Sequence, residues 1–280
     1  MNVEYWLNVA YIKLQSIGNT SARLDSEVLL SYVLNKNISW LMCYGCYKLN
    51  SKDLKLANSL LMRRMCGEPI AYLVGKKEFW SLSLLVSNAT LIPRSDTEIL
   101  VEQTLMRIEK DSKKKILDLG TGCGCVALAL ASERETCCII GVDCMQESLK
   151  IAKRNAKVLH LNNVIFFHSF WFSSVNEIFD VIVSNPPYVS LNEITSLDKS
   201  LSFEPLIALI STNNGLGSIK YIIKHSKKYL NNMGWLLIEH GWTQKVSVQK
   251  LFKKYHFFNI MTYKDYSRND RITVGQKKQI

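Results

Sequence analysis

Short apolar runs alternate with helix-like segments from residue 115 onward in this 280-residue chain, and the alternation narrows the possible fold classes. Runs of four to eight residues rich in Val and Ile are typical of buried strands. Their alternation with helices predicts an α/β fold with a mostly parallel sheet and helices on both faces. The expected strands are 116–119, 139–142, 164–167, 181–184, 235–239, 256–263 and 271–274, and the expected helices are 126–132, 147–156 and 217–229.

Residues 1–71 differ in character and predict a small helical bundle. Trp6, Ala10 and Leu14 recur at helical spacing, and Ser51 suits the N-cap of a third helix. Apolar and polar residues then alternate within 72–94, which indicates a β-hairpin linker to a domain formed by 95–280. Ser95 and Glu98 fit the S-x-x-E capping box of a helix that begins there.

Charge, cysteine content and hydropathy narrow the class of protein. The net charge of +11 would suit an acidic partner, but the lysines are dispersed and no basic run reaches five. Eight cysteines without a secretion signal indicate reduced thiols, and the single CxxC, Cys43–Cys46, lacks the second pair of a zinc site. No apolar run reaches the roughly 18–20 residues of a membrane helix. We therefore expect a cytoplasmic monomer without a metal and without a membrane.

A glycine-rich turn, Asp118-Leu119-Gly120-Thr121-Gly122-Cys123-Gly124, lies between the first strand of the sheet and its helix. Glycines let the backbone approach a ligand, and the helix N-terminus offers free N–H groups. Asp143 ends the next strand, where a carboxylate suits ribose hydroxyls. The turn fits both S-adenosylmethionine (SAM) and NAD(P), and it leaves the two cofactors open.

The segment Asn185-Pro186-Pro187-Tyr188, called the NPPY loop below, follows the fourth strand and favours SAM. Ligands of open α/β sheets lie beyond the carboxyl ends of the strands, so this loop should face the cofactor. The Asn185 side chain and the Pro186 carbonyl offer two acceptors, and Tyr188 offers an aromatic face. Two acceptors beside an aromatic wall suit a planar NH₂ group whose nitrogen receives a methyl group.

With these motifs the chain resembles a class I SAM-dependent methyltransferase and, more closely, the release factor glutamine N5-methyltransferase family (PrmC/HemK). The resemblance implies a Rossmann-like domain with a seven-stranded sheet, preceded by the helical bundle and the hairpin. It extends over nearly the whole chain, through GEPIAYLVGKKEFW at 67–80, LIPRSDTEILVE at 91–102, DLGTGCGCVALALA at 118–131, SNPPYV at 184–189, FEPLIAL at 203–209 and LLIEHGW at 236–242.

The resemblance also implies roles for single residues. The glycine turn would wrap the methionine end of SAM, Asp143 would hold the ribose and Trp171 would lie near the adenine. The cofactor-binding residues implied are Gly120, Thr121, Gly122, Cys123, Gly124, Asp143, Trp171 and Asn185. The substrate would be the glutamine of the GGQ loop of peptide-chain release factors, gripped by Asn185, Pro186, Pro187 and Tyr188, with Asn185, Pro186 and Tyr188 acting in catalysis. The N-terminal helices would help to dock the release factor.

Two departures from the family pattern and three rival functions accompany this interpretation. Ser95 stands where the family usually has a proline, which should make the loop slightly less rigid. Phe170 stands where the family often has an aspartate that could accept from the adenine amino group; we expect weaker SAM binding or a stacking contact in its place, without loss of activity. A DNA or RNA amino-methyltransferase would share the NPPY logic, but no extra base-recognition domain is evident. An NAD-dependent dehydrogenase would need an acid/base constellation that the five histidines do not provide. A non-catalytic binding protein would not need an intact NPPY loop.

Overall fold

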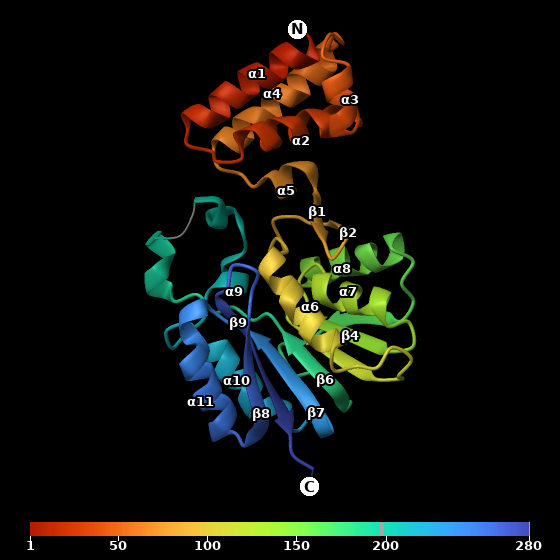
Figure 1. Ribbon diagram of the computed structural model, residues 1–280, viewed down its shortest axis with the longest axis vertical. Coiled ribbons are helices and arrows are strands. Elements are labelled where there is room, and N and C mark those ends of the chain that lie inside the picture. The colour runs from red at the N-terminus through yellow and green to blue at the C-terminus, as the bar shows by residue number, and fades with distance from the viewer. Residues whose placement is uncertain (197–198, 280) are drawn as a thin grey trace. The chain divides into compact units, whose positions relative to one another are not determined.

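The computed structural model describes residues 1–196 and 199–279, which form two compact units (Figure 1). Residues 1–76 and 199–203 belong to the first unit, and residues 77–196 and 204–279 belong to the second. Within the described residues, no helix has both the length and the apolar character needed to cross a membrane.

The first unit is a set of helices with its own core. Trp6 and Leu14 are buried, as their helical spacing predicts. Asn50 caps the fourth helix by accepting a hydrogen bond from the Asp53 N–H, whereas the predicted cap, Ser51, already lies in the first helical turn. The predicted bundle is thus confirmed with a one-residue correction. Its helices are α1 (Val3–Ser16), α2 (Ala22–Leu34), α3 (Ile38–Cys43), α4 (Ser51–Met65) and α5 (Ile70–Val74).

A short hairpin of β1 (Lys76–Phe79) and β2 (Leu82–Leu85) follows α5. It starts after the predicted residue 72, because residues 70–74 are helical. Trp80 and Ser81 join the strands with φ of 51° and 59°, which is the two-residue turn that matches strand twist. Asn155 anchors β2: its Oδ1 accepts from the Leu85 N–H at 2.7 Å and its Nδ2 donates to the Leu85 carbonyl at 3.0 Å.

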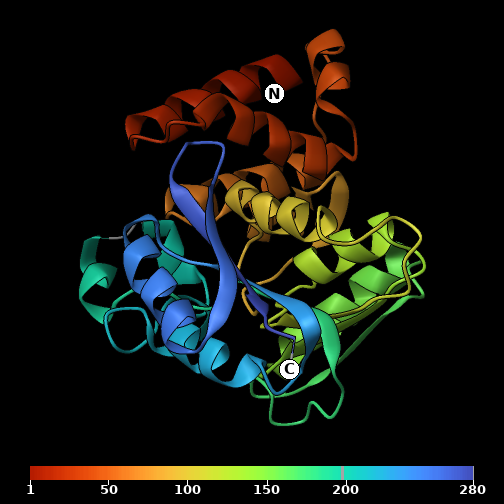
Figure 2. The ribbon, with the colours of Figure 1, turned by 60° about the horizontal axis from the view of Figure 1, so that its bottom comes forward.

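The second unit is built on a seven-stranded sheet in the order β5-β4-β3-β6-β7-β9-β8. Neighbouring strands are parallel except at β9, which runs antiparallel to β7 and β8 and ends the chain in the blue pair of Figure 2. The predicted α/β architecture is confirmed, because apolar runs such as 181–184 are buried on both faces. The strands are β3 (Lys115–Leu119), β4 (Cys138–Asp143), β5 (Val164–His168), β6 (Phe179–Ser184), β7 (Leu230–Glu239), β8 (Phe257–Lys264) and β9 (Asp270–Lys277).

Helices cover both faces of this sheet (Figure 1). α6, α7 and α8 pack side by side on one face, and α10 and α11 pack together on the other. The predicted helix 217–229 ends at Ser226, because β7 begins at Leu230. The five long helices are α6 (Glu98–Leu105), α7 (Cys125–Glu133), α8 (Gln146–Val158), α10 (Gly217–Ser226) and α11 (Lys245–Lys254). The shorter ones are η1 (Ser95–Thr97), η2 (Leu191–Ser196), α9 (Leu206–Leu209) and η4 (Trp242–Gln244), whereas η3 (Lys199–Phe203) belongs to the first unit.

The capping box predicted at Ser95 and Glu98 is wrong. Ser95 opens the short helix η1, and α6 starts only at Glu98 with no side-chain cap. The Glu98 carboxylate instead accepts a hydrogen bond from the Trp80 N–H at 2.9 Å, in the turn of the hairpin. The Glu98 carboxylate is therefore engaged in a tertiary contact and does not cap the helix as the local motif would require.

Candidate active site

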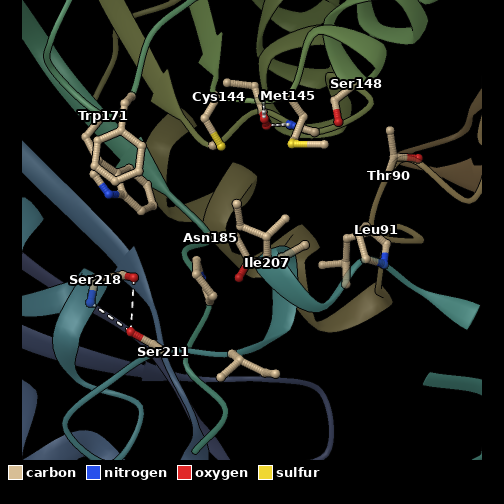
Figure 3. Close-up of a pocket in the computed structure, with 18 of the residues that line it drawn as sticks. Thr90, Leu91, Cys144, Met145, Ser148, Trp171, Asn185, Ile207, Ser211 and Ser218 are labelled. Carbon is tan, nitrogen blue, oxygen red and sulfur yellow. Dashed lines mark hydrogen bonds between the residues drawn. The ribbon is translucent and has the colours of Figure 1, made fainter. Parts of the chain in front are cut away.

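A cavity of about 290 Å³ opens at the carboxyl ends of β3, β4, β5 and β6 (Figure 3). The chain runs outward from β3 through β4 to β5 and then crosses back to β6 on the other side of β3. Ligands of open α/β sheets bind at such a reversal of strand order. Residues after each of these strands line the cavity, together with the segment 205–212 and Ser218. The predicted site residues found in its wall are Gly120, Gly122, Asp143, Trp171, Asn185 and Pro187.

The glycine turn has two parts with different tasks. Gly120 and Gly122 line the cavity with φ of 72° and 57°, a conformation that side-chain-bearing residues rarely adopt. Gly124, with φ of 88°, does not face the cavity; a Cβ there would lie 3.0–3.2 Å from Leu128, Phe166 and Ala152. It therefore allows α7 to pack closely against its neighbours.

Thr121 and Cys123, also expected in the cofactor site, are buried in the turn itself. The Thr121 hydroxyl donates to Asp118 Oδ2 at 2.6 Å, and the Cys123 carbonyl accepts from Asn155 Nδ2 at 2.9 Å. Burial raises the pKa of Asp118 to about 7. These three groups hold the shape of the turn, and none of them belongs to the cavity wall.

Asp143, the last residue of β4, binds the glycine turn directly. Its Oδ2 accepts from the Gly122 N–H at 2.9 Å, and its Oδ1 accepts from the Met145 N–H at 2.8 Å. Burial raises the pKa of Asp143, and these backbone donors act in the opposite direction. Each carboxylate oxygen keeps lone-pair capacity for a hydroxyl of a ligand in the cavity.

Two aromatic side chains after β5 form another part of the wall. The Trp171 ring lies over Gly120, where a Cβ would be 3.5 Å from the ring. Phe170 is 58% exposed, and its ring is tilted by 56° against Trp171 at a centroid distance of 6.2 Å. The departure at Phe170 thus places an apolar ring at the cavity wall instead of a carboxylate.

The NPPY loop contributes Asn185 and Pro187 to the cavity, and Pro186 is buried. The Asn185 Nδ2 donates to the Thr97 hydroxyl at 3.1 Å. Tyr188 is turned away from the cavity: its hydroxyl donates to Glu239 Oε1 at 3.3 Å. Burial, followed by the nearby Glu239 charge, raises the pKa of Tyr188 far above its ordinary value.

The structure also brings in residues that the sequence analysis did not assign to the site. Thr97 and Glu239 contact the NPPY loop, and Glu239 is only 1% exposed. Glu204 accepts from the Ile92 N–H at 3.0 Å and pairs with Arg94, which ties the segment before the cavity wall 205–212 to residues 91–94. These residues belong to the family motifs at 91–102, 203–209 and 236–242, and this membership is the sequence signal that could have identified them.

Comparisons with known proteins agree with this geometry. A family model described as methyltransferase small domain matches residues 95–200, and one described as PrmC N-terminal domain matches residues 5–75. The release factor glutamine methyltransferase of Buchnera aphidicola subsp. Baizongia pistaciae is 57% identical over 99% of this chain and 100% of that protein. The protein of the same name from Escherichia coli (strain K12) is 42% identical over 100% of both chains.

Solved structures with lower similarity share the fold. A methyltransferase from Pyrococcus furiosus has a TM-score of 0.54 and 15% identity, covering 79% of this chain and 98% of that one. The 16S rRNA N2 G1207 methyltransferase from Thermus thermophilus, solved with AdoMet and guanosine, has a TM-score of 0.54 and 16% identity over 72% and 50% of the two chains. This chain is 42–57% identical to these curated relatives over nearly the full length of both proteins. It therefore belongs to the release factor glutamine methyltransferase family.

Proposed function

We propose that this protein transfers a methyl group from S-adenosylmethionine to the side-chain amide nitrogen, N5, of the glutamine in the GGQ motif of peptide-chain release factors. The names of its close relatives support the release factor and the glutamine. The observation that carries the chemistry is the Asn185 amide: its NH₂ is engaged by Thr97, which leaves Oδ1 as an acceptor in the cavity wall.

The residues around the cavity fit S-adenosylmethionine, which supplies the methyl group when bound. Gly120 and Gly122 allow close approach of the methionine end, and Asp143 offers carboxylate oxygens to the ribose. Trp171 offers a ring face to the adenine. Thr121, Cys123 and Gly124 act in this proposal by fixing the backbone of the turn that contacts the cofactor.

The substrate amide requires orientation because its nitrogen lone pair is delocalised. Asn185 Oδ1 and the Pro186 carbonyl would accept hydrogen bonds from the two N–H groups and favour charge on nitrogen as it becomes pyramidal. Preorganised dipoles of this kind contribute about 3–4 kcal/mol each in other enzymes. Pro187 faces the amide from the cavity wall, and Tyr188 holds the loop from behind through its hydrogen bond to Glu239. Alignment with the methyl group lowers the barrier further. The proton can leave after transfer, so no dedicated base is required.

Each part of the chain has its own proposed role. We assign residues 1–71 to docking of the release factor, residues 72–94 to the linker and residues 95–280 to methyl transfer. The protein acts as a monomer in the cytoplasm, where it meets release factors, and nucleic acid is not its direct substrate.

Methyl transfer from labelled SAM to a purified release factor tests this function, with nucleic acid as the parallel substrate. We expect label on the release factor alone, and its loss in Asn185→Ala. Asn231→Ala is the matched control, since Asn231 lies exposed near the start of β7, at the opposite end of the strands from Asn185. Label on nucleic acid alone would move the protein to the base-methyltransferase class, and SAM binding without any label would contradict both functions.

A further inference from the structure

Four side chains meet directly behind Asn185, on the side away from the cavity. They come from η1, the NPPY loop, β7 and β9, and we call them the Glu239 cluster. Glu239 Oε1 accepts from the Tyr188 hydroxyl at 3.3 Å, and the nearby Thr97 hydroxyl favours the charged form of the carboxylate, lowering its pKa. The charge of Arg271 also acts on it. The cluster consists of Thr97, Tyr188, Glu239 and Arg271.

Burial of a carboxylate at this place costs free energy. Glu239 is 1% exposed, and among the described residues its Oε2 has no hydrogen-bond partner. A buried ionisable group of this kind is often less stable than an apolar residue of similar volume. The burial raises the pKa of Glu239 to about 7, against the opposing influence of Thr97, Arg271 and Tyr188. Perturbed groups next to a cavity are candidates for a functional role.

The direction of the hydrogen bonds suggests what that role is. An ionised carboxylate can only accept, whereas a threonine hydroxyl has one proton to donate and lone pairs that accept. When Thr97 donates its proton to Glu239, it can only accept from Asn185. The Asn185 amide must then present Nδ2 to Thr97, as observed at 3.1 Å, and turn Oδ1 the other way.

We propose that Glu239 is a positioning residue that acts through the Thr97 hydroxyl to hold the Asn185 amide with its oxygen toward the substrate. The proposal rests on the function proposed above, because it assumes an NH₂ group that must meet an acceptor. Tyr188 takes part in the same way, since its donation to Glu239 turns its hydroxyl away from the cavity and orients the NPPY loop. Gln244 supports the loop from outside by donating to the Tyr188 carbonyl at 3.0 Å.

Protonation of Glu239 would remove this bias. The carboxylic acid can donate to Thr97, and the Thr97 proton then becomes available to the Asn185 oxygen. The amide could turn over and present NH₂ to the substrate NH₂, where two donors would oppose each other. Loss of the correct orientation at a reacting group costs up to about a hundredfold in rate. Methyl transfer should therefore rise with pH as Glu239 ionises.

The other charged groups around Glu239 keep their charge over this pH interval or are held elsewhere. Arg271, from β9, stays protonated and is fixed by Asp265 at 3.0 Å and by Asp96, from η1, at 3.2 Å. His240 follows Glu239 in the chain, and its ring bonds to Thr273 at 2.7 Å and to the Gly241 carbonyl. Burial lowers the pKa of His240, so it is neutral near pH 7. Glu239 is thus the group in the cluster that changes charge near neutrality.

The test compares three threonine variants with the wild-type protein. Thr97→Val removes the hydroxyl that links Glu239 to Asn185. Thr104→Val is the matched control: Thr104 is equally buried on α6, and its hydroxyl donates only to the Leu100 carbonyl of the same helix. We expect Thr97→Val to lower kcat on a release factor by about ten- to hundredfold, Thr104→Val to leave it unchanged, and Thr97→Ser to recover most of the lost activity. Equal kcat values for Thr97→Val and Thr104→Val would overturn the proposal.

A pH profile gives a readout that a merely structural role would not move. In the wild-type protein kcat should rise through neutral pH, and this rise should be absent in Glu239→Gln, because an amide does not titrate. An unchanged rise in Glu239→Gln would overturn the proposal even if Thr97→Val failed to fold. Because the wild-type protein is measured first, absence of wild-type transfer would refute the proposed function, whereas normal wild-type transfer with insensitive variants would refute this inference alone.

Discussion

The substitution Asp143→Asn tests the cofactor site at its most connected side chain. Asp143 accepts two backbone hydrogen bonds, from Gly122 at 2.9 Å and from Met145 at 2.8 Å. Asparagine keeps one oxygen, and its NH₂ group would face the other N–H donor. At least one hydrogen bond to a charged acceptor is lost, and such a bond contributes about 1.5–3 kcal/mol. The glycine turn that lines the cavity would then lose its fixed position.

That free energy corresponds to about a 10- to 150-fold increase in the dissociation constant for SAM, when the substitution destabilises only the SAM complex and not the free protein. Isothermal titration calorimetry with SAM measures the change, and thermal unfolding shows how much falls on the free protein. Asp180→Asn is the matched control, since Asp180 also accepts a backbone hydrogen bond, from Lys115 at 2.9 Å, but at the other end of the sheet. Equal dissociation constants for the two variants would refute the assignment of Asp143 to the ribose.

Three further predictions concern packing, cofactor affinity and pH. In Gly215→Ala a Cβ would lie 2.1 Å from a carbonyl oxygen of the NPPY loop, so transfer should fall well below that of Gly18→Ala, which has a similar positive φ but open space; equal rates in a methylation assay would contradict this. Phe170→Asp should tighten SAM binding by placing a carboxylate beside the adenine. Calorimetry that shows no decrease in the dissociation constant would contradict this prediction. The free energy of unfolding should fall between pH 5 and pH 8, and it should fall less in Glu239→Gln. Burial raises the pKa values of Asp118 and Glu239 to about 7, so the folded state holds more protons than the unfolded state. Urea unfolding at a series of pH values measures this slope.

The parallel sheet could be predicted from the sequence because its strands are buried on both faces. Such strands are continuous apolar runs, as at 139–142 and 181–184, and a short run bounded by turn residues is a strong local signal. The ends of the elements were less accessible. Ser95 and Glu98 form a capping box in the sequence, yet Glu98 is bound by Trp80, and no local rule reports a partner in another element.

The site likewise contains residues that could be identified from the sequence and residues that could not. Gly120, Gly122 and Asp143 were identifiable because their roles depend on where a strand ends, which the apolar pattern reveals. The orientation of Tyr188 was not, because it depends on Glu239, 51 residues further along the chain. The burial of Thr121 likewise results from its bond to Asp118 within the turn. Side-chain direction is set by such partners, and the sequence does not name them.

Mass spectrometry of a release factor treated with this protein and SAM identifies the residue that receives the methyl group. We predict that the peptide carrying the GGQ motif gains one methyl group, that fragmentation places it on the glutamine side chain, and that Asn185→Ala leaves the peptide unmodified. A methyl group on any other residue would contradict glutamine N5 as the methylated atom, and methylation of the glutamine by Asn185→Ala at the wild-type rate would contradict the role of Asn185.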